Sequence, residues 1–256
     1  MISSAVAVRS VVDRNLLFFR RDWALLVAGF LEPIFWLIAI DTGLSAFVAD
    51  VDYDGQLVEY TAFVAPGLIA ASALNAAAFD STYNFYYKLA VQRIYDAMIA
   101  TPLSIGNVVL GEVIWSVLRA TLYSTAFLAL SVGFGLIESW WALLIVPASA
   151  LIGFSISAVG IFSSTFVRSW NDFDYFGLAI QLLFIGSATF YPITVYPTWA
   201  QVLVNVTPLY HGVALCRALA LGTPSLSDLF HLGVLLATTA FFAWWARQRL
   251  EAKLLH

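Results

Sequence analysis

Charge is scarce in this sequence. Only 11% of its 256 residues are charged, 61% are hydrophobic, and the mean hydropathy is +0.86. A typical water-soluble domain has about 25% charged and about 45–50% apolar residues. A chain of this size keeps a large surface after folding, so one core cannot hide such an excess. The composition therefore argues against an ordinary soluble domain and predicts that lipid is the solvent.

Lysine is nearly missing, and with it the usual nucleotide-binding signature. The two lysines, Lys88 and Lys253, follow Tyr87 and Ala252, so neither lies in a G-x-x-x-x-G-K-[ST] phosphate loop. If ATP drives this protein, another chain must bind it. The basic residues form no concentrated patch, so we expect no nucleic-acid partner.

Catalytic and metal-binding signatures are also missing. The single cysteine, Cys216, cannot form a disulfide within the chain. The three histidines, His211, His231 and His256, do not have the spacing of metal ligands. We therefore expect no metal, no cofactor in this chain and no enzymatic activity of its own.

Long apolar stretches dominate what remains. One membrane crossing needs roughly 20 mostly apolar residues. We predict an all-α integral membrane protein, with residues 1–256 forming a single transmembrane domain of six helices. The spans are expected at about 23–42, 60–87, 105–134, 140–167, 175–190 and 226–246.

One of these regions is too long for a single crossing. Tyr175–Cys216 contains 42 residues without a charge. One continuous helix of this length would reach roughly 63 Å, about twice the hydrocarbon thickness. Pro192, Pro197 and Pro208 argue against such a helix. The region either crosses twice, or crosses once and dips partly back.

The positive-inside rule decides between these options. With a cytoplasmic N-terminus and alternating spans, ten of the 12 basic residues face the cytoplasm, and only Arg119 and Arg217 do not. The acidic loop at 50–59 then lies outside. This works for an even number of crossings, so we predict one span followed by a re-entrant or interfacial helical pair at about 191–219. Both termini are expected in the cytoplasm.

The first helix is expected before the first span, over residues 5–19. Val8, Val12 and Phe19 fall near one helical face, and the charged residues lie elsewhere. This pattern is typical of an amphipathic helix in the membrane interface. The alternative is a cytosolic extension of the first span.

A second short helix is expected between spans two and three, in "VQRIYDAMIA" (91–100). Thr101-Pro102 ends it, because proline disfavours helix in the preceding residue. We interpret this helix as a docking element on the cytoplasmic side, with an ordinary interfacial linker as the alternative. Its apolar stripe consists of Val91, Ile94, Tyr95, Met98 and Ile99.

The candidate intramembrane charges are Glu32, Asp80, Glu112 and Arg119. Each costs a few kcal/mol near a helix centre. Together with Asn75 they are candidates for a translocation path; the alternative is structural ion pairs or residues near the interface. An ion-coupled carrier would use Glu32, Asp80 and Arg119, but carriers usually contain internal repeats, and the halves show none. A lipid-modifying enzyme would need clustered nucleophiles or metal ligands.

Several segments resemble the type-2 ABC exporter permeases, especially the nodulation-factor and daunorubicin-type exporters. The resemblance covers about the whole chain, and "YDAMIATPLS" is its most specific part. One departure is "GSATF" (186–190), where the family usually has Ser-Gly before an outer Phe-Pro motif. The matching segments are "EYTAFVAPGLIAASALNAAAFDSTYN" (59–84), "QRIYDAMIATPLSIGNVVLGEVIWSVLRA" (92–120), "FYPITVYPTWAQ" (190–201) and "TPLYHGVALCRALALG" (207–222).

This resemblance implies an assembly in the bacterial cytoplasmic (inner) membrane. Two permease subunits, identical or paralogous, would form one conduit, and two separate nucleotide-binding ATPase subunits would hold ATP and Mg beneath it. Substrates of this group are amphipathic, such as lipids, lipo-oligosaccharides, glycolipids, polyketides and hydrophobic drugs.

The resemblance also assigns roles to residues. The helix around 93–100 would be the coupling helix seated in the ATPase, and the N-terminal helix would touch the ATPase as well. The outer helical pair would cap the exit path. The coupling residues would be Arg93, Tyr95, Asp96, Met98, Thr101 and Pro102, and the outer pair would contain Tyr191, Pro192, Pro208, Tyr210 and His211.

Overall fold

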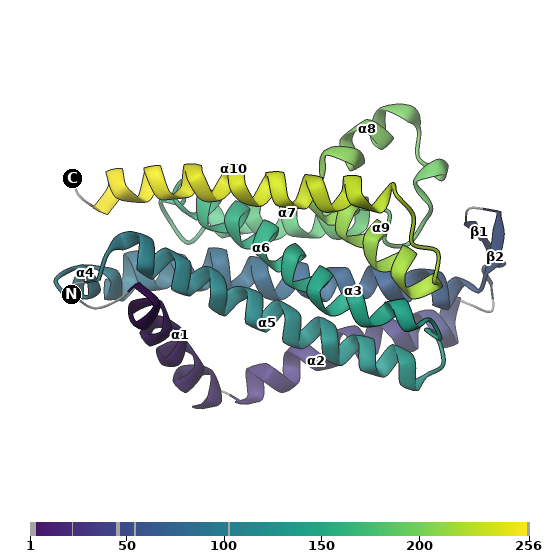
Figure 1. Cartoon of the computed structure of the whole chain (residues 1–256), viewed down its shortest axis with the longest axis horizontal. Coiled ribbons are helices and arrows are strands. Elements are labelled where there is room, and N and C mark those ends of the chain that lie inside the picture. Colours follow the sequence, from purple (N-terminus) through teal and green to yellow (C-terminus); the bar gives the residue numbers. More distant parts are fainter. Residues whose placement is uncertain (1–3, 22, 45–46, 54, 102, 255–256) are drawn as a thin grey trace.

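The computed structural model describes residues 4–21, 23–44, 47–53, 55–101 and 103–254, and most of them are helical. Long helices lie lengthwise in one bundle (Figure 1). One end of the bundle carries α4 (Ile94–Ile99) and both chain termini. The other end carries a short antiparallel hairpin of β1 (Val51–Tyr53) and β2 (Gln56–Val58). The predicted helical fold class is confirmed at this level.

The centre of the bundle is α3 (Tyr60–Phe79), whose described residues are buried on almost every side. It packs against α5 (Ile105–Gly133), α6 (Ile145–Ser164) and α9 (Pro208–Leu221). Small residues allow this close approach, as is common between helices in lipid. A Cβ atom at Gly67 would lie 3.0 Å from the Thr189 carbonyl oxygen. The seven alanines of α3 that are at most 5% exposed explain why this central helix tolerates neighbours on all sides; they are Ala65, Ala70, Ala71, Ala73, Ala76, Ala77 and Ala78.

Four helical segments in the described part of the chain are long and apolar enough to cross a membrane. They agree with predicted spans two, three, four and six, so a multi-pass protein is confirmed. Counting the bent pair described below as one span would give five. The four segments are Tyr60–Val91, Ile105–Gly133, Trp140–Ser164 and Asp228–Leu250.

The predicted first and fifth spans are not among these four segments. α2 (Trp23–Ala39) continues into a π-helical turn, Ile40–Leu44, and α7 covers Asp172–Gly186, which is 15 residues. A helix of 15 residues reaches about 22 Å, which is less than the hydrocarbon core of a typical bilayer. α7 also ends four residues before the predicted boundary at 190. The count of six spans therefore stays a prediction.

The second predicted span is longer than expected and not purely α-helical. After α3 the chain forms π-helical turns at Asp80–Asn84 and Tyr87–Val91, so the rod ends at Val91 rather than at Tyr87. A Cβ atom at Gly160 of α6 would overlap the Ser81 side chain, so the π-helical segment lies directly against α6. π-helical turns inside α-helices are rare and often occur at functional sites.

The outer pair has the predicted broken shape. α8 (Thr198–Val206) and α9 meet at an angle of 89°. Pro208 is the first residue of α9, where a missing N–H costs no intrahelical hydrogen bond. α8 projects from the bundle, and α8 and the connection from α9 to α10 (Asp228–Leu254) both lie toward the hairpin end (Figure 1). This arrangement agrees with a chain that enters and leaves on one side.

A buried arginine holds α9 in place. Arg217 is 3% exposed, and its guanidinium lies 3.9 Å from the centre of the Phe63 ring. Its Nε donates to the Phe63 carbonyl oxygen at 3.1 Å, and its Nη2 donates to the carbonyl oxygens of Ala188 and Thr189 at 3.0 and 3.2 Å. The side chain thereby joins α9 to α3 and to the turn after α7. The sequence had marked Arg217 only as a cation outside the cytoplasmic set.

Candidate docking end and buried polar clusters

α4 is shorter than the helix predicted at 91–100. It covers Ile94–Ile99, while Val91 belongs to the preceding π-helical turn and Arg93 has a left-handed φ of +50°. This backbone conformation is uncommon outside glycine and marks a sharp change of direction. The chain turns again after α4, where the Thr101 backbone N–H donates to the Met98 carbonyl oxygen at 3.0 Å. Pro102 lies outside the described residues.

Tyr95 does not lie where the resemblance suggested. Its side chain is 1% exposed, and its ring centre is 5.2 Å from that of Phe85. The residues around it come from α4, the second span, α5, α6 and α10, so the cluster joins the ends of four long helices. Tyr95 is thus enclosed by residues of its own chain and anchors α4. The anchor cluster is Phe85, Leu89, Tyr95, Ile105, Val108, Ile161, Ala246 and Leu250.

Burial and the negative charge of nearby Glu112 raise the pKa of Tyr95 well above its usual value, so its side chain is neutral at physiological pH. Other residues of α4 and its two flanks are exposed. Arg93, Ala97 and Thr101 are exposed, and Met98 is half-buried. The side chain of Asp96 lies outside the described ones. The exposed face of α4 therefore differs from the expected apolar stripe.

Glu112 is the centre of a buried cluster that links α1 (Ser4–Arg21) to the bundle. One of its carboxylate oxygens accepts a hydrogen bond from Arg14 Nη2 at 2.7 Å, and the other accepts from Lys88 Nζ at 2.6 Å. Asn15 Nδ2 donates to the same carboxylate at 3.0 Å. Glu112 is 5% exposed, so two cations share one buried carboxylate. We call this the Glu112 cluster.

Apolar contacts also hold α1 against the bundle, beside the Glu112 cluster. Val8 and Phe19 are buried and Val12 is half-buried, as their common face predicted. A Cβ atom at Gly111 of α5 would lie 2.6 Å from the Cβ of Val11, so the two helices touch closely. The apolar face of α1 therefore rests partly on α5.

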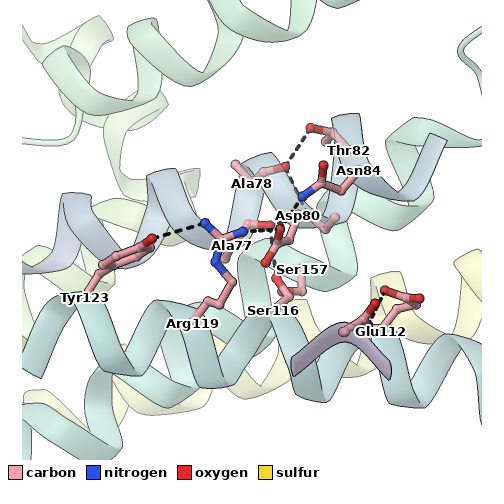
Figure 2. Close-up of polar contacts among 12 residues, drawn as sticks. Ala77, Ala78, Asp80, Thr82, Asn84, Glu112, Ser116, Arg119, Tyr123 and Ser157 are labelled. Atoms are coloured by element: carbon pink, nitrogen blue, oxygen red, sulfur yellow. Dashed lines mark hydrogen bonds and ion pairs between the residues drawn. The ribbon is translucent and has the colours of Figure 1, made fainter. Parts of the chain in front are cut away.

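Asp80 and Arg119 form a second cluster, shown in Figure 2. Arg119 Nη1 lies 2.5 Å from Asp80 Oδ1, and Asn84 Nδ2 donates to the same oxygen at 2.6 Å. Arg119 Nη2 also donates to the Tyr123 hydroxyl at 3.4 Å. Asp80 and Arg119 thus pair the π-helical turn after α3 with α5, which fits the structural alternative stated for them.

Two candidates for a translocation path remain, Asn75 and Glu32. Asn75 lines a cavity together with Arg119. The side chain of Glu32 lies outside the described ones. A role in translocation stays a prediction for all five residues.

The outer pair contains a histidine contact that the sequence did not predict. His211 Nδ1 lies 2.7 Å from His231 Nδ1, and His211 Nε2 lies 2.8 Å from the Asn205 carbonyl oxygen. This contact joins α8, α9 and α10. Tyr191 is 55% exposed, while Tyr210 is half-buried.

Sequence patterns could not show which residues of these clusters contact each other. Glu112 lies 98 positions from Arg14 along the chain, and Arg217 lies 154 positions from Phe63. Each cation had only a local context of apolar or charged neighbours. No periodicity connects such pairs, because their contact exists only after the helices have packed.

Known proteins are similar to this sequence over most of its length. Residues 6–221 match the family described as ABC-2 type transporter. The chain is 31% identical over 230 residues to Nodulation protein J of Rhizobium leguminosarum bv. viciae, covering 88% of this chain and 86% of that protein. It is 28% identical over 251 residues to Nodulation protein J of Bradyrhizobium diazoefficiens, covering 95% and 93%.

These similarities confirm the resemblance found in the sequence motifs. The matched region begins in α1 and ends at the last residue of α9, so it includes α4, both buried polar clusters and the outer pair. The chain therefore belongs to the ABC-2 type transporter family.

Proposed function

We propose that this protein is the permease subunit of an ATP-driven exporter. It moves an amphipathic substrate out of the cytoplasm or the inner leaflet of a bacterial cytoplasmic membrane. Two separate ATPase subunits supply ATP and Mg, and a second permease subunit, identical or paralogous, completes the conduit. The family match supports a transport subunit, and the amphipathic substrate class is what the resemblance of the sequence motifs implies.

The anchoring of α4 carries the proposal. A coupling element must receive a movement at its exposed face and pass it to the spans without deforming. Ala97 is exposed on α4, Arg93 is exposed directly before it, and the buried face of α4 places Tyr95 among the ends of four long helices. A rigid side chain packed at interior density transmits strain efficiently. α4 is thus built to move the helix ends together.

Docking is tested with Ala97→Arg, a change on the exposed face of α4. We expect normal insertion and folding, because the side chain faces outward, but at least about a tenfold loss of ATPase association, since a long charged side chain blocks a packed interface. Association is measured by co-purification of the tagged permease with its ATPase, and function by ATP-dependent export in vesicles.

Ala49→Arg is the matched control, because Ala49 is exposed at the opposite end of the bundle. It should bind the ATPase normally. If Ala97→Arg also binds and exports normally, α4 is a linker. Export that continues without ATP but stops on collapse of the proton gradient would support the ion-coupled carrier instead.

Orientation is tested by cysteine labelling with an impermeant thiol reagent. Asp52→Cys lies in the hairpin and Asn171→Cys lies in the turn before α7, at the other end of the bundle. We expect labelling of Asp52→Cys from outside intact cells and of Asn171→Cys only after lysis, because basic residues concentrate on the cytoplasmic side. The native Cys216 is fully buried and should contribute little background. The reverse pattern would contradict the proposed topology.

A further inference from the structure

A cavity of about 780 Å³ lies between α1, α2, the second span and α5. This volume is within the usual range of small-molecule sites, roughly 300–1,000 Å³. Its lining combines cationic side chains with aromatic ones. The described cations on it are Arg14, Arg21, Lys88 and Arg119.

The electrostatics of this cavity favour an anion. Arg119 is neutralised by Asp80, but Arg14 and Lys88 share the single carboxylate of Glu112. The Glu112 cluster therefore keeps one excess positive charge, and Arg21 adds another at the cavity wall. None of the described lining residues is acidic. The Lys88 side chain is only 17% exposed, and a positive charge with little access to water is costly unless an anion accompanies it.

The lining of the cavity changes along the bundle from partly charged to mostly apolar. Lys88, Gln92 and Ile94 belong to the end of the bundle that carries α4, and the wall farther along the bundle is formed by Phe79, Trp115 and Ala76. An anionic head near α4 would thus have an apolar wall beside it for the start of a hydrocarbon chain. Burying that chain contributes about 0.8 kcal/mol for each methylene group.

We propose that this cavity binds an amphiphile with a phosphate or carboxylate head, taken from the cytoplasmic leaflet. Its head contacts Lys88, Arg14 and Arg21, and its chain lies against Phe79 and Trp115. The inference rests on the proposed placement of the α4 end at the cytoplasmic face. The ligand is either a resident membrane lipid or the exported cargo, since both present this chemistry.

Binding is measured without the ATPase, so that it can succeed or fail independently of export. The purified protein is exposed to equal amounts of phosphatidylglycerol and phosphatidylcholine with the same acyl chains, and retained lipid is counted by native mass spectrometry. We expect about a tenfold preference for phosphatidylglycerol, the effect of one charge-assisted hydrogen bond.

Lys88→Gln and Arg21→Gln should each reduce that preference several-fold. Arg21→Gln is informative even if Lys88→Gln disturbs folding, because Arg21 is exposed and lies outside the Glu112 cluster. Arg9→Gln is the control, because Arg9 is an exposed α1 cation that is not among the residues lining the cavity. Equal retention of both lipids, or an unchanged preference in both variants, would overturn the proposal.

Whether the ligand is a resident lipid or the exported cargo is tested in vesicles that contain the permease and its ATPase. ATP-dependent movement of a fluorescent phosphatidylglycerol analogue to the outer leaflet identifies the ligand as cargo. Retention without movement identifies a resident lipid. Both results agree with the proposed binding site. Only the lipid-preference measurement can contradict it.

Discussion

Glu112→Ala is expected to destabilise this protein more than any other single change in the buried clusters. It leaves Arg14 and Lys88 without their shared carboxylate, and removing one partner of a buried ion pair costs about 3 kcal/mol or more. α1 should then detach from α5, because the Glu112 cluster is the main polar link between them. The measurement is thermal unfolding in detergent together with the yield of folded protein.

A matched control uses the other ion pair of α1. Arg9 and Asp13 are 82% and 55% exposed, and their closest charged atoms are 3.4 Å apart. Asp13→Ala should change stability by no more than about 0.5 kcal/mol, as is usual for exposed pairs. Glu112→Gln should lie between the two, because it keeps the shape and loses the charge. Equal stability of Glu112→Ala and Asp13→Ala would show that the cluster contributes nothing.

Tyr95→Ala is expected to separate ATP hydrolysis from export. The side chain is almost fully buried in the anchor cluster, and truncation of a buried aromatic residue costs about 3–5 kcal/mol. The exposed face of α4 remains, so the ATPase should still bind weakly, but α4 should no longer move the helix ends as a unit. Export per ATP hydrolysed, measured in vesicles, should fall at least about tenfold, as expected from losing about 1.4 kcal/mol of coupling.

Tyr95→Phe is the control for this experiment. The Tyr95 hydroxyl is buried, and within the described residues no hydrogen bond to it is found. Phenylalanine keeps the contact with Phe85 and fills nearly the same space, so coupling should remain close to normal. If Tyr95→Ala exports as efficiently as Tyr95→Phe, α4 does not transmit movement through this anchor.

Much of the architecture could be predicted because its causes are local. Long uncharged stretches must form helices in lipid, since every backbone polar group has to be satisfied within its own segment. Three prolines in one uncharged region excluded a continuous helix, and the structure has α8 and α9 there at 89°. A short helix was predicted at 91–100 from its motif and from Thr101-Pro102, and the structure has a helix there that covers only Ile94–Ile99.

The expectations that failed depended on how the helices face one another. The resemblance implied that Tyr95 belongs to the surface seated in the ATPase, but Tyr95 packs into the protein's own core. Helical periodicity shows which residues share a face, and it contains no information about what that face contacts. The sequence could not distinguish an outward stripe from an inward one.

The sequence by itself determined a helical membrane protein, its family and the approximate positions of its long apolar segments, because composition and proline act over short distances along the chain. Only the tertiary structure decided the roles of its few charges. Lys88 lies 24 positions from Glu112 and Arg119 lies 39 from Asp80, yet packing brings each pair into direct contact. In a low-dielectric interior a charge must find a partner, and the identity of that partner depends on which helices become neighbours.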